Sequence, residues 1–109
     1  MTKHLKAHWS LLKKLKTCKP KERKQILKKG GKPLQLCLQE CAINILKGNV
    51  HLSDAQHKRL KRYKDKVRLL SKKTTSKKKK LDIEQRGGFL PALLAPVVGS
   101  LLGAIFKKS

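Results

Sequence analysis

The last fifth of the sequence carries GGFLPALLAPVVGSLLGAIF, residues 87–106, a run of twenty residues without a charged side chain. As a helix it would be roughly 30 Å long, about the thickness of the hydrocarbon core of a bilayer. Bulky residues alternate with small ones, and Gly99 and Gly103 form a G-x-x-x-G step, which is typical of closely packed apolar helices. Pro91 and Pro96 indicate that the regular part of this helix begins only near Pro96.

Three uses of this apolar segment are open from the sequence. The segment can cross or disturb a membrane, fold back onto the rest of the chain, or dock in a groove of another protein. The lysines that precede it would guide a membrane-active helix to anionic lipid. The side chains that would make the membrane or partner contact are the bulky ones: Phe89, Leu90, Leu93, Leu94, Val97, Val98, Leu101, Leu102, Ile105 and Phe106.

The rest of the chain is strongly cationic. Among 109 residues, 29 Lys and Arg stand against 6 Asp and Glu, a formal net charge of +23. Such an excess disfavours a compact state through self-repulsion and predicts a polyanionic partner. Aromatic residues are too scarce for single-strand binding by base stacking, and a surface dominated by lysine suits phosphates better than base edges. The composition therefore favours non-specific binding of double-stranded DNA.

Apolar spacing predicts a basic helical domain over residues 1–72. Residues 3–17 form an amphipathic pattern with a basic outer face, and a short second helix over 20–29 is expected to end at a Gly-Gly pair. The segment 33–47 follows the i, i+3, i+4, i+7 pattern and is apolar around most of its surface. We therefore expect 33–47 to be the central helix of the domain.

A fourth helix, 54–72, is expected to begin with a capping box formed by Ser53 and Gln56. Its apolar stripe is narrow, and cationic side chains cover the remaining surface. We expect the like-charged segment 73–87 to be a flexible, disordered basic linker, and 88–109 to be a separate apolar helix or tail. The predicted fold is therefore all-α: a small bundle of three to four short helices, a disordered basic linker and a separate C-terminal apolar helix.

The DNA-phosphate contacts are assigned to cationic side chains on the first, second and fourth helices and on the linker. They are Lys13, Lys14, Lys16, Lys24, Lys28, Lys29, Lys58, Arg59, Lys61, Arg62, Lys66, Arg68, Lys72, Lys73, Lys77, Lys78, Lys79 and Lys80. The acids are scattered without a visible acid–base pair, so we expect no enzyme activity and no catalytic residue. Cys37 and Cys41 lie on the apolar face as core thiols. His4 and His8 share a helical face but lack further ligands, so neither a metal nor another cofactor is expected.

The layout resembles a family of small basic viral proteins. CLQECAINILKGNVHLS at 37–53, a lysine run, and QRGGFLPALLAPVVGSLLGAIF at 85–106 are similar to pX-like proteins of Polinton/Maverick elements and adintoviruses. Those proteins are compared with the adenovirus core protein mu precursor. The resemblance covers residues 20–106, and its most specific parts are the CxxxCAxNxLKGN stretch from Cys37 to Asn49 and the Gly-Gly pair before the apolar tail.

This resemblance implies a virion core or minor capsid protein that condenses packaged double-stranded DNA, located in the virion and, during assembly, in the host nucleus. It also implies a substrate of an adenovirus-type cysteine protease, whose site contains Gly87 and Gly88 and is cut after Gly88. Gln85 stands where such sites usually carry an aliphatic residue, and the alternative role of the two glycines is a hinge. The alternative function is a membrane-active viral protein, lytic or anchoring, that acts through the apolar tail, and capsid protein is a further partner for that tail.

Overall fold

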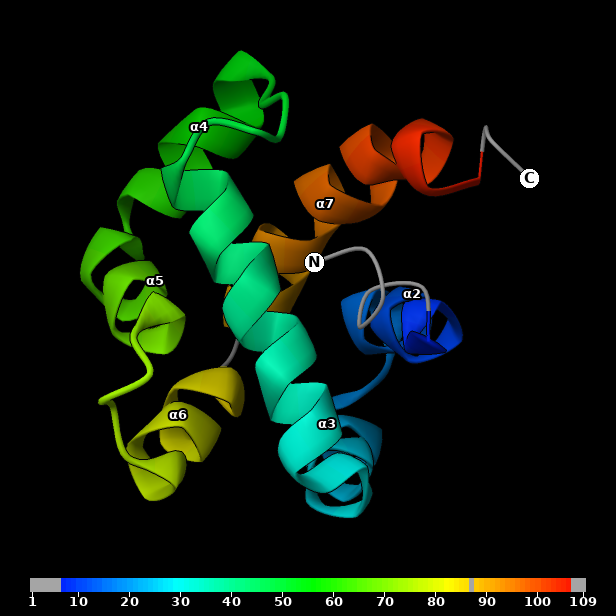
Figure 1. Ribbon diagram of the computed structural model, residues 1–109, viewed down its shortest axis with the longest axis vertical. Helices are drawn as coiled ribbons and strands as arrows, with labels where there is room; N and C mark the ends of the chain where they lie inside the picture. Colours follow the sequence, from blue (N-terminus) through cyan, green and yellow to red (C-terminus); the bar gives the residue numbers. More distant parts are fainter. Residues whose placement is uncertain (1–6, 87, 107–109) are drawn as a thin grey trace.

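The computed structural model describes residues 7–86 and 88–106, with side chains described as far as residue 99. Within these ranges the regular secondary structure is entirely helical, which confirms the all-α prediction. The helices are α2 (Trp9–Thr17), α3 (Pro20–Leu46), α4 (Asp54–Lys61), α5 (Lys64–Ser71), α6 (Lys77–Glu84) and α7 (Phe89–Phe106). In Figure 1, α3 runs through the middle of the molecule, α7 crosses behind it, α2 lies to one side and α4, α5 and α6 to the other.

The central helix α3 consists of two helical segments that meet at Gly31, where φ is 57° and ψ is −150°. This backbone region is open essentially only to glycine, so the Gly-Gly pair produces the break that the sequence predicts. Pro33 falls in the first turn of the second segment, where its missing N–H removes no helical hydrogen bond. A Cβ added at Gly30 would come within 2.6 Å of the Leu34 Cβ, so this position also requires a bare backbone.

The second segment of α3 is the centre of the core, as the periodicity predicts. Leu34, Leu38, Cys37 and Cys41 are all fully buried. The side-chain hydrogen bond between Cys41 and Cys37, together with burial, raises the pKa of the Cys41 thiol well above its usual value, so this thiol stays protonated. The two cysteines are therefore core residues in the structure.

The predicted single helix over 54–72 is wrong, because the structure has two helices there. Ser53 caps α4 through the predicted capping box with Gln56, and the helix then ends in a tight turn in which Tyr63 N–H donates to the Leu60 carbonyl. The narrow apolar stripe explains the break: one straight helix could face only one neighbour. The turn lets α4 pack on α7 while α5 packs on α3.

The expected disordered linker over 73–87 also differs from the structure, which forms α6 over Lys77–Glu84. Ser76 caps this helix by accepting a hydrogen bond from the Lys79 N–H at 3.1 Å. Ile83 and Glu84 are buried, so α6 is anchored to the bundle by its far end. Packing of α6 against α3, α5 and α7 opposes the mutual repulsion of its lysines. This packing cannot be inferred from the composition of the segment itself.

The apolar tail is not a separate element, which corrects the third part of the fold prediction. α7 packs against α2, α3, α4 and α6, and the side chains of Phe89, Leu90, Leu93, Leu94 and Val97 are completely buried. The helix α2 packs on α7, and its buried side chains are Trp9, Leu12 and Leu15. Of the three uses considered for the apolar segment, the structure therefore shows the second, in which it folds back onto the rest of the chain.

The helix α7 begins at Phe89 rather than near Pro96, again unlike the prediction. Pro91 lies in the first turn, where no N–H is needed, and the Ala92 N–H donates to the Gly88 carbonyl at 3.2 Å. None of the helices in the described ranges has the length and apolarity that crossing a bilayer demands.

Candidate nucleic-acid interface

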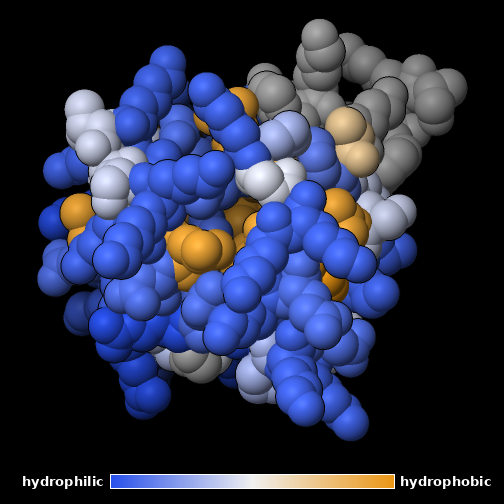
Figure 2. All heavy atoms as spheres, turned by 90° about the horizontal axis from the view of Figure 1, so that it is seen from below, coloured by the Kyte–Doolittle hydropathy of each residue, from blue (hydrophilic) through white to orange (hydrophobic). Residues whose placement is uncertain are grey.

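Most of the predicted DNA-contacting side chains lie on the outside of the bundle. Fifteen of them are exposed: Lys13, Lys14, Lys24, Lys28, Lys29, Lys58, Arg59, Lys61, Arg62, Arg68, Lys72, Lys73, Lys77, Lys78 and Lys79. They project from α2, the first segment of α3, α4, α5 and α6, so the cationic surface is spread over several elements. Figure 2 shows hydrophilic side chains crowding one face of the molecule, with small hydrophobic patches between them.

The helix α4 carries the densest group of exposed cations. Lys58, Arg59 and Arg62 border a shallow hollow with Ala55, with a volume of about 260 Å³. The capping box fixes where α4 begins, and Leu60 anchors its inner face in the core. Side chains three and four residues apart then share the outer face, as a surface for neighbouring phosphates requires.

Two of the assigned lysines are half-buried, and one of these makes a contact within the fold. The Lys66 ammonium lies 5.5 Å from the centre of the Tyr63 ring, at a distance where a cation is attracted by the ring face. Tyr63 in turn meets Phe89 edge-on, with ring centres 5.6 Å apart. Tyr63 therefore joins the α4–α5 corner to α7, with Lys66 beside its ring. Lys16 is likewise half-buried.

The assignment of Lys80 as a surface contact is wrong, because only 6% of this residue is exposed. Its ammonium donates to the Gln39 side-chain oxygen at 2.7 Å. Burial lowers the pKa of Lys80, and the neighbouring Glu84 carboxyl opposes this shift. Packing of α6 on α3 buries this lysine, whereas the other lysines of the same run stay outside.

Glu84 is a second buried ionisable group on α6. The residue is fully buried, and neither of its carboxyl oxygens has a hydrogen-bond partner among the described residues. Burial raises the pKa of Glu84 to about 8, and the charge of Lys80 opposes the shift. Glu84 is therefore mostly neutral at pH 7 and does not cancel the positive charge of Lys80.

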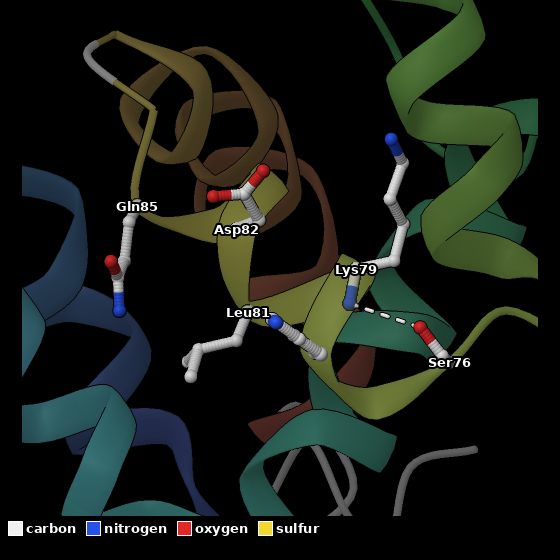
Figure 3. A pocket seen from close by; sticks show the side chains of 6 residues that line it. Ser76, Lys79, Leu81, Asp82 and Gln85 are labelled. Atoms are coloured by element: carbon white, nitrogen blue, oxygen red, sulfur yellow. Dashed lines mark hydrogen bonds between the residues drawn. The ribbon is translucent and has the colours of Figure 1, made fainter.

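The outer side of α6 forms a hollow of about 410 Å³. In Figure 3, Lys79 extends from one side of the helix, Leu81 and Gln85 project from the other, and the dashed line marks the Ser76 cap. Asp82 also lines this hollow, so its charge is mixed. A carboxylate at this position makes the hollow less suited to a phosphate than a purely cationic surface.

A larger cleft, of about 600 Å³, lies between α3 and α6. Four lysines, two glutamines, a threonine and a leucine line it: Lys32, Gln35, Leu36, Gln39, Lys73, Thr75, Lys77 and Lys80. Lys32, Gln35 and Gln39 are not among the site residues predicted from the sequence. Their signal was the spacing i, i+3 and i+7, which puts three polar residues on one line of an otherwise apolar helix.

The predicted cleavage site is only partly within the described residues, because Gly87 lies outside them. Gly88 is exposed with φ at 79°, and a Cβ there would come 3.0 Å from the Tyr63 hydroxyl. Phe89, on the other side of the expected cut, is fully buried. The bond after Gly88 thus joins an exposed residue to a core residue.

The side chains predicted to contact a membrane or partner fall into two groups, those that are buried and those outside the described part of the chain. The side chains of Phe89, Leu90, Leu93, Leu94, Val97 and Val98 lie in the core, which corrects their assignment as an outward contact surface. The side chains of Leu101, Leu102, Ile105 and Phe106 lie outside the described residues, as does His4 of the considered histidine pair. Over the part of the chain that is described, no three His, Cys, Asp or Glu side chains gather as a metal site would require.

Comparison with known proteins adds no relative. The chain matches no protein-family model, no curated protein and no solved structure.

Proposed function

We propose that this protein binds double-stranded DNA without sequence specificity and condenses it through contacts between its lysine and arginine side chains and the phosphates. The supporting observation is the unequal exposure of charge on a folded bundle. Fifteen of the assigned cations are exposed, while among the six acids Glu84 is buried and Glu40 is half-buried. The outer surface is therefore more one-sided in charge than the composition alone indicates, and a polyanion relieves its repulsion.

The spread of cations over several helices favours condensation rather than docking in a single groove. A protein that reads sequence presents one recognition element to the major groove. Here exposed lysines and arginines project from α2, α3, α4, α5 and α6, so one molecule can contact more than one duplex segment. Lysine suits this role because its ammonium is a point charge with freely rotating donors.

Measurement of duplex affinity against salt tests the proposal. Each phosphate neutralised adds about 0.9 to the slope of log affinity on log salt. We expect a steep slope that is equal for duplexes of unrelated sequence. Replacement of Lys58, Arg59 and Arg62 by glutamine should reduce the slope by about 2 to 3, because three contacts are lost.

The matched control exchanges Lys and Arg at the same three positions and so keeps every charge. This control should retain the slope of the unmodified protein. A shallow slope in the unmodified chain, or affinity that depends strongly on base sequence, would contradict the proposal.

The resemblance to pX-like proteins supports a narrower form of the proposal: a virion core or minor capsid protein that compacts packaged DNA in the virion and in the host nucleus during assembly. In this form the chain is a substrate of an adenovirus-type cysteine protease that cuts after Gly88. Because Phe89 is buried, the cut requires the first turn of α7 to open. Mass spectrometry of purified particles should find the chain cut after Gly88, and an intact chain in mature particles would contradict processing.

The alternative, a membrane-active or capsid-binding protein acting through its tail, requires α7 to leave the bundle. Five side chains of α7 between Phe89 and Val97 are completely buried, so release exposes the centre of the core. Leakage of anionic vesicles by the whole chain measures this activity. We expect none until α7 has been freed, and leakage by the intact folded chain would favour the alternative.

A further inference from the structure

The cleft between α3 and α6 differs from the rest of the cationic surface because it is concave. Its floor is one face of the second α3 segment, with Lys32, Gln35 and Gln39. The facing wall is the α5–α6 connection and the start of α6 (Figure 1). The Gln35 side-chain amide donates to the Lys77 carbonyl at 3.4 Å and joins the two walls. A volume of about 600 Å³ is within the range of pockets that hold small ligands.

The charge of the cleft is of a single sign. Four of the eight lining residues are lysines, and none of the eight, within the described part of the chain, is a carboxylate. Lys32, Lys73 and Lys77 are exposed at the rim, and Lys80 lies at the buried end. The hollow on the other side of α6, which Asp82 lines, lacks this feature.

Lys80 supplies an independent observation that points to an anion. A buried cation is costly unless an opposite charge or several hydrogen bonds compensate it. Lys80 has three donors, and its hydrogen bond within the described residues is to the neutral amide of Gln39. It does not donate to Glu84, because both oxygens of that carboxyl are without hydrogen-bond partners. The fold thus places the ammonium of a largely buried lysine at the end of the cleft, hydrogen-bonded to a neutral amide and not to a carboxylate.

The remaining lining residues narrow the class of ligand. Gln35, Gln39 and Thr75 offer polar groups, and Leu36 is the sole apolar side chain among the eight. None of these eight described residues is aromatic, so they offer no ring to stack on a nucleobase. Because the lysines lie on two facing walls, they can bind several linked phosphate groups at once, which a single small anion could not provide.

We propose that the cleft between α3 and α6 is a binding site for a small polyphosphate anion, held by the four lysines that line it. The site shares the rim lysines Lys73 and Lys77 with the proposed duplex-binding surface, but a duplex cannot reach Lys80 at the inner end of the cleft. The ligand compensates the buried charge of Lys80 and draws the rim lysines together. Binding therefore fastens α6 to α3.

Isothermal titration with tripolyphosphate in about 150 mM salt tests the site, because this salt screens exposed charges. We expect a single-site isotherm for the unmodified protein. Lys80→Gln should weaken binding by about tenfold or more, since a buried charged hydrogen bond is lost. Lys58→Gln, which removes the same charge from the exposed face of α4, should weaken it by less than about twofold. Equal losses in the two variants would overturn the proposal.

Two further comparisons complete the test. If Lys80→Gln does not melt cooperatively, the exposed rim variants Lys73→Gln and Lys77→Gln replace it in the test. Each should weaken tripolyphosphate binding by about threefold. Unchanged affinity in both variants would overturn the site. Adenosine triphosphate should bind no more tightly than tripolyphosphate, because the cleft offers no surface for the base. Duplex binding should persist in Lys80→Gln, so failure of the cleft proposal is distinguishable from failure of the duplex proposal.

Discussion

Replacement of Glu84 by glutamine should remove most of the pH dependence of this protein's stability between weakly acidic and weakly alkaline conditions. Glu84 is fully buried, and its carboxyl oxygens have no hydrogen-bond partners within the described residues. Burial raises its pKa from the usual 4.5 to about 8 against the opposing charge of Lys80. Glutamine has nearly the same shape and cannot ionise, so the exchange isolates the effect of the charge.

Proton linkage sets the sign and the size of the effect. The folded protein holds the Glu84 proton more tightly than the unfolded chain, so the free energy of unfolding falls as the pH rises from 4.5 to about 8. Each pH unit in this window costs up to about 1.4 kcal/mol, which amounts to about 5 kcal/mol over the window. Below the window Glu84 is protonated in both states, and above it the penalty is constant.

Urea denaturation followed by circular dichroism, at intervals between about pH 5 and pH 9, measures this free energy. We expect the unmodified protein to lose stability steadily and Glu84→Gln to stay nearly level. The matched control is Asp82→Asn, which removes the same charge from an exposed position on the same helix. This control should follow the unmodified protein. Parallel curves for the unmodified protein and Glu84→Gln would refute the reasoning, because Glu84 would then not be held neutral by burial.

Three further predictions concern the core and the break in α3. Leu94→Ala should lower the free energy of unfolding by about 2 to 5 kcal/mol in urea denaturation, and a change below about 1 kcal/mol would mean that α7 is not part of the core. Gly31→Ala should cost about 1 to 3 kcal/mol in the same assay because alanine is strained at this φ and ψ, so an unchanged midpoint would contradict the break. Thiol titration of the folded protein should modify half-buried Cys18 well before the buried Cys37 and Cys41, and simultaneous reaction of all three would contradict their burial.

The sequence was most informative where the cause of structure is local. Gly31 breaks the helix because only glycine adopts its backbone angles, and Ser53 caps α4 because Gln56 returns the hydrogen bond. The strong apolar periodicity of 33–47 likewise placed Cys37 and Cys41 in the core. These outcomes depend on residues within a few positions of one another.

Sequence patterns did not determine how segments distant in the chain share the core. The apolar stretch beginning at Phe89 has the composition of a membrane segment, and only its packing against α2 and α3 makes it the interior of a bundle. The lysine run ending at Lys80 has the composition of a disordered linker, yet packing on α3 gives α6 a buried end.

The candidate sites likewise depend partly on the sequence and partly on the tertiary structure. The amino-acid sequence by itself determined the excess of positive charge and the helical spacing of the apolar residues, because charge and periodicity are properties of the chain. Only the tertiary structure decided that Lys80 and Glu84 are buried while Lys79 and Asp82 on the same helix are exposed. It also decided that Lys32 and Lys77 line one cleft. Burial and desolvation arise from what the rest of the chain places around a residue, and this is the physical reason that no local pattern could reveal them.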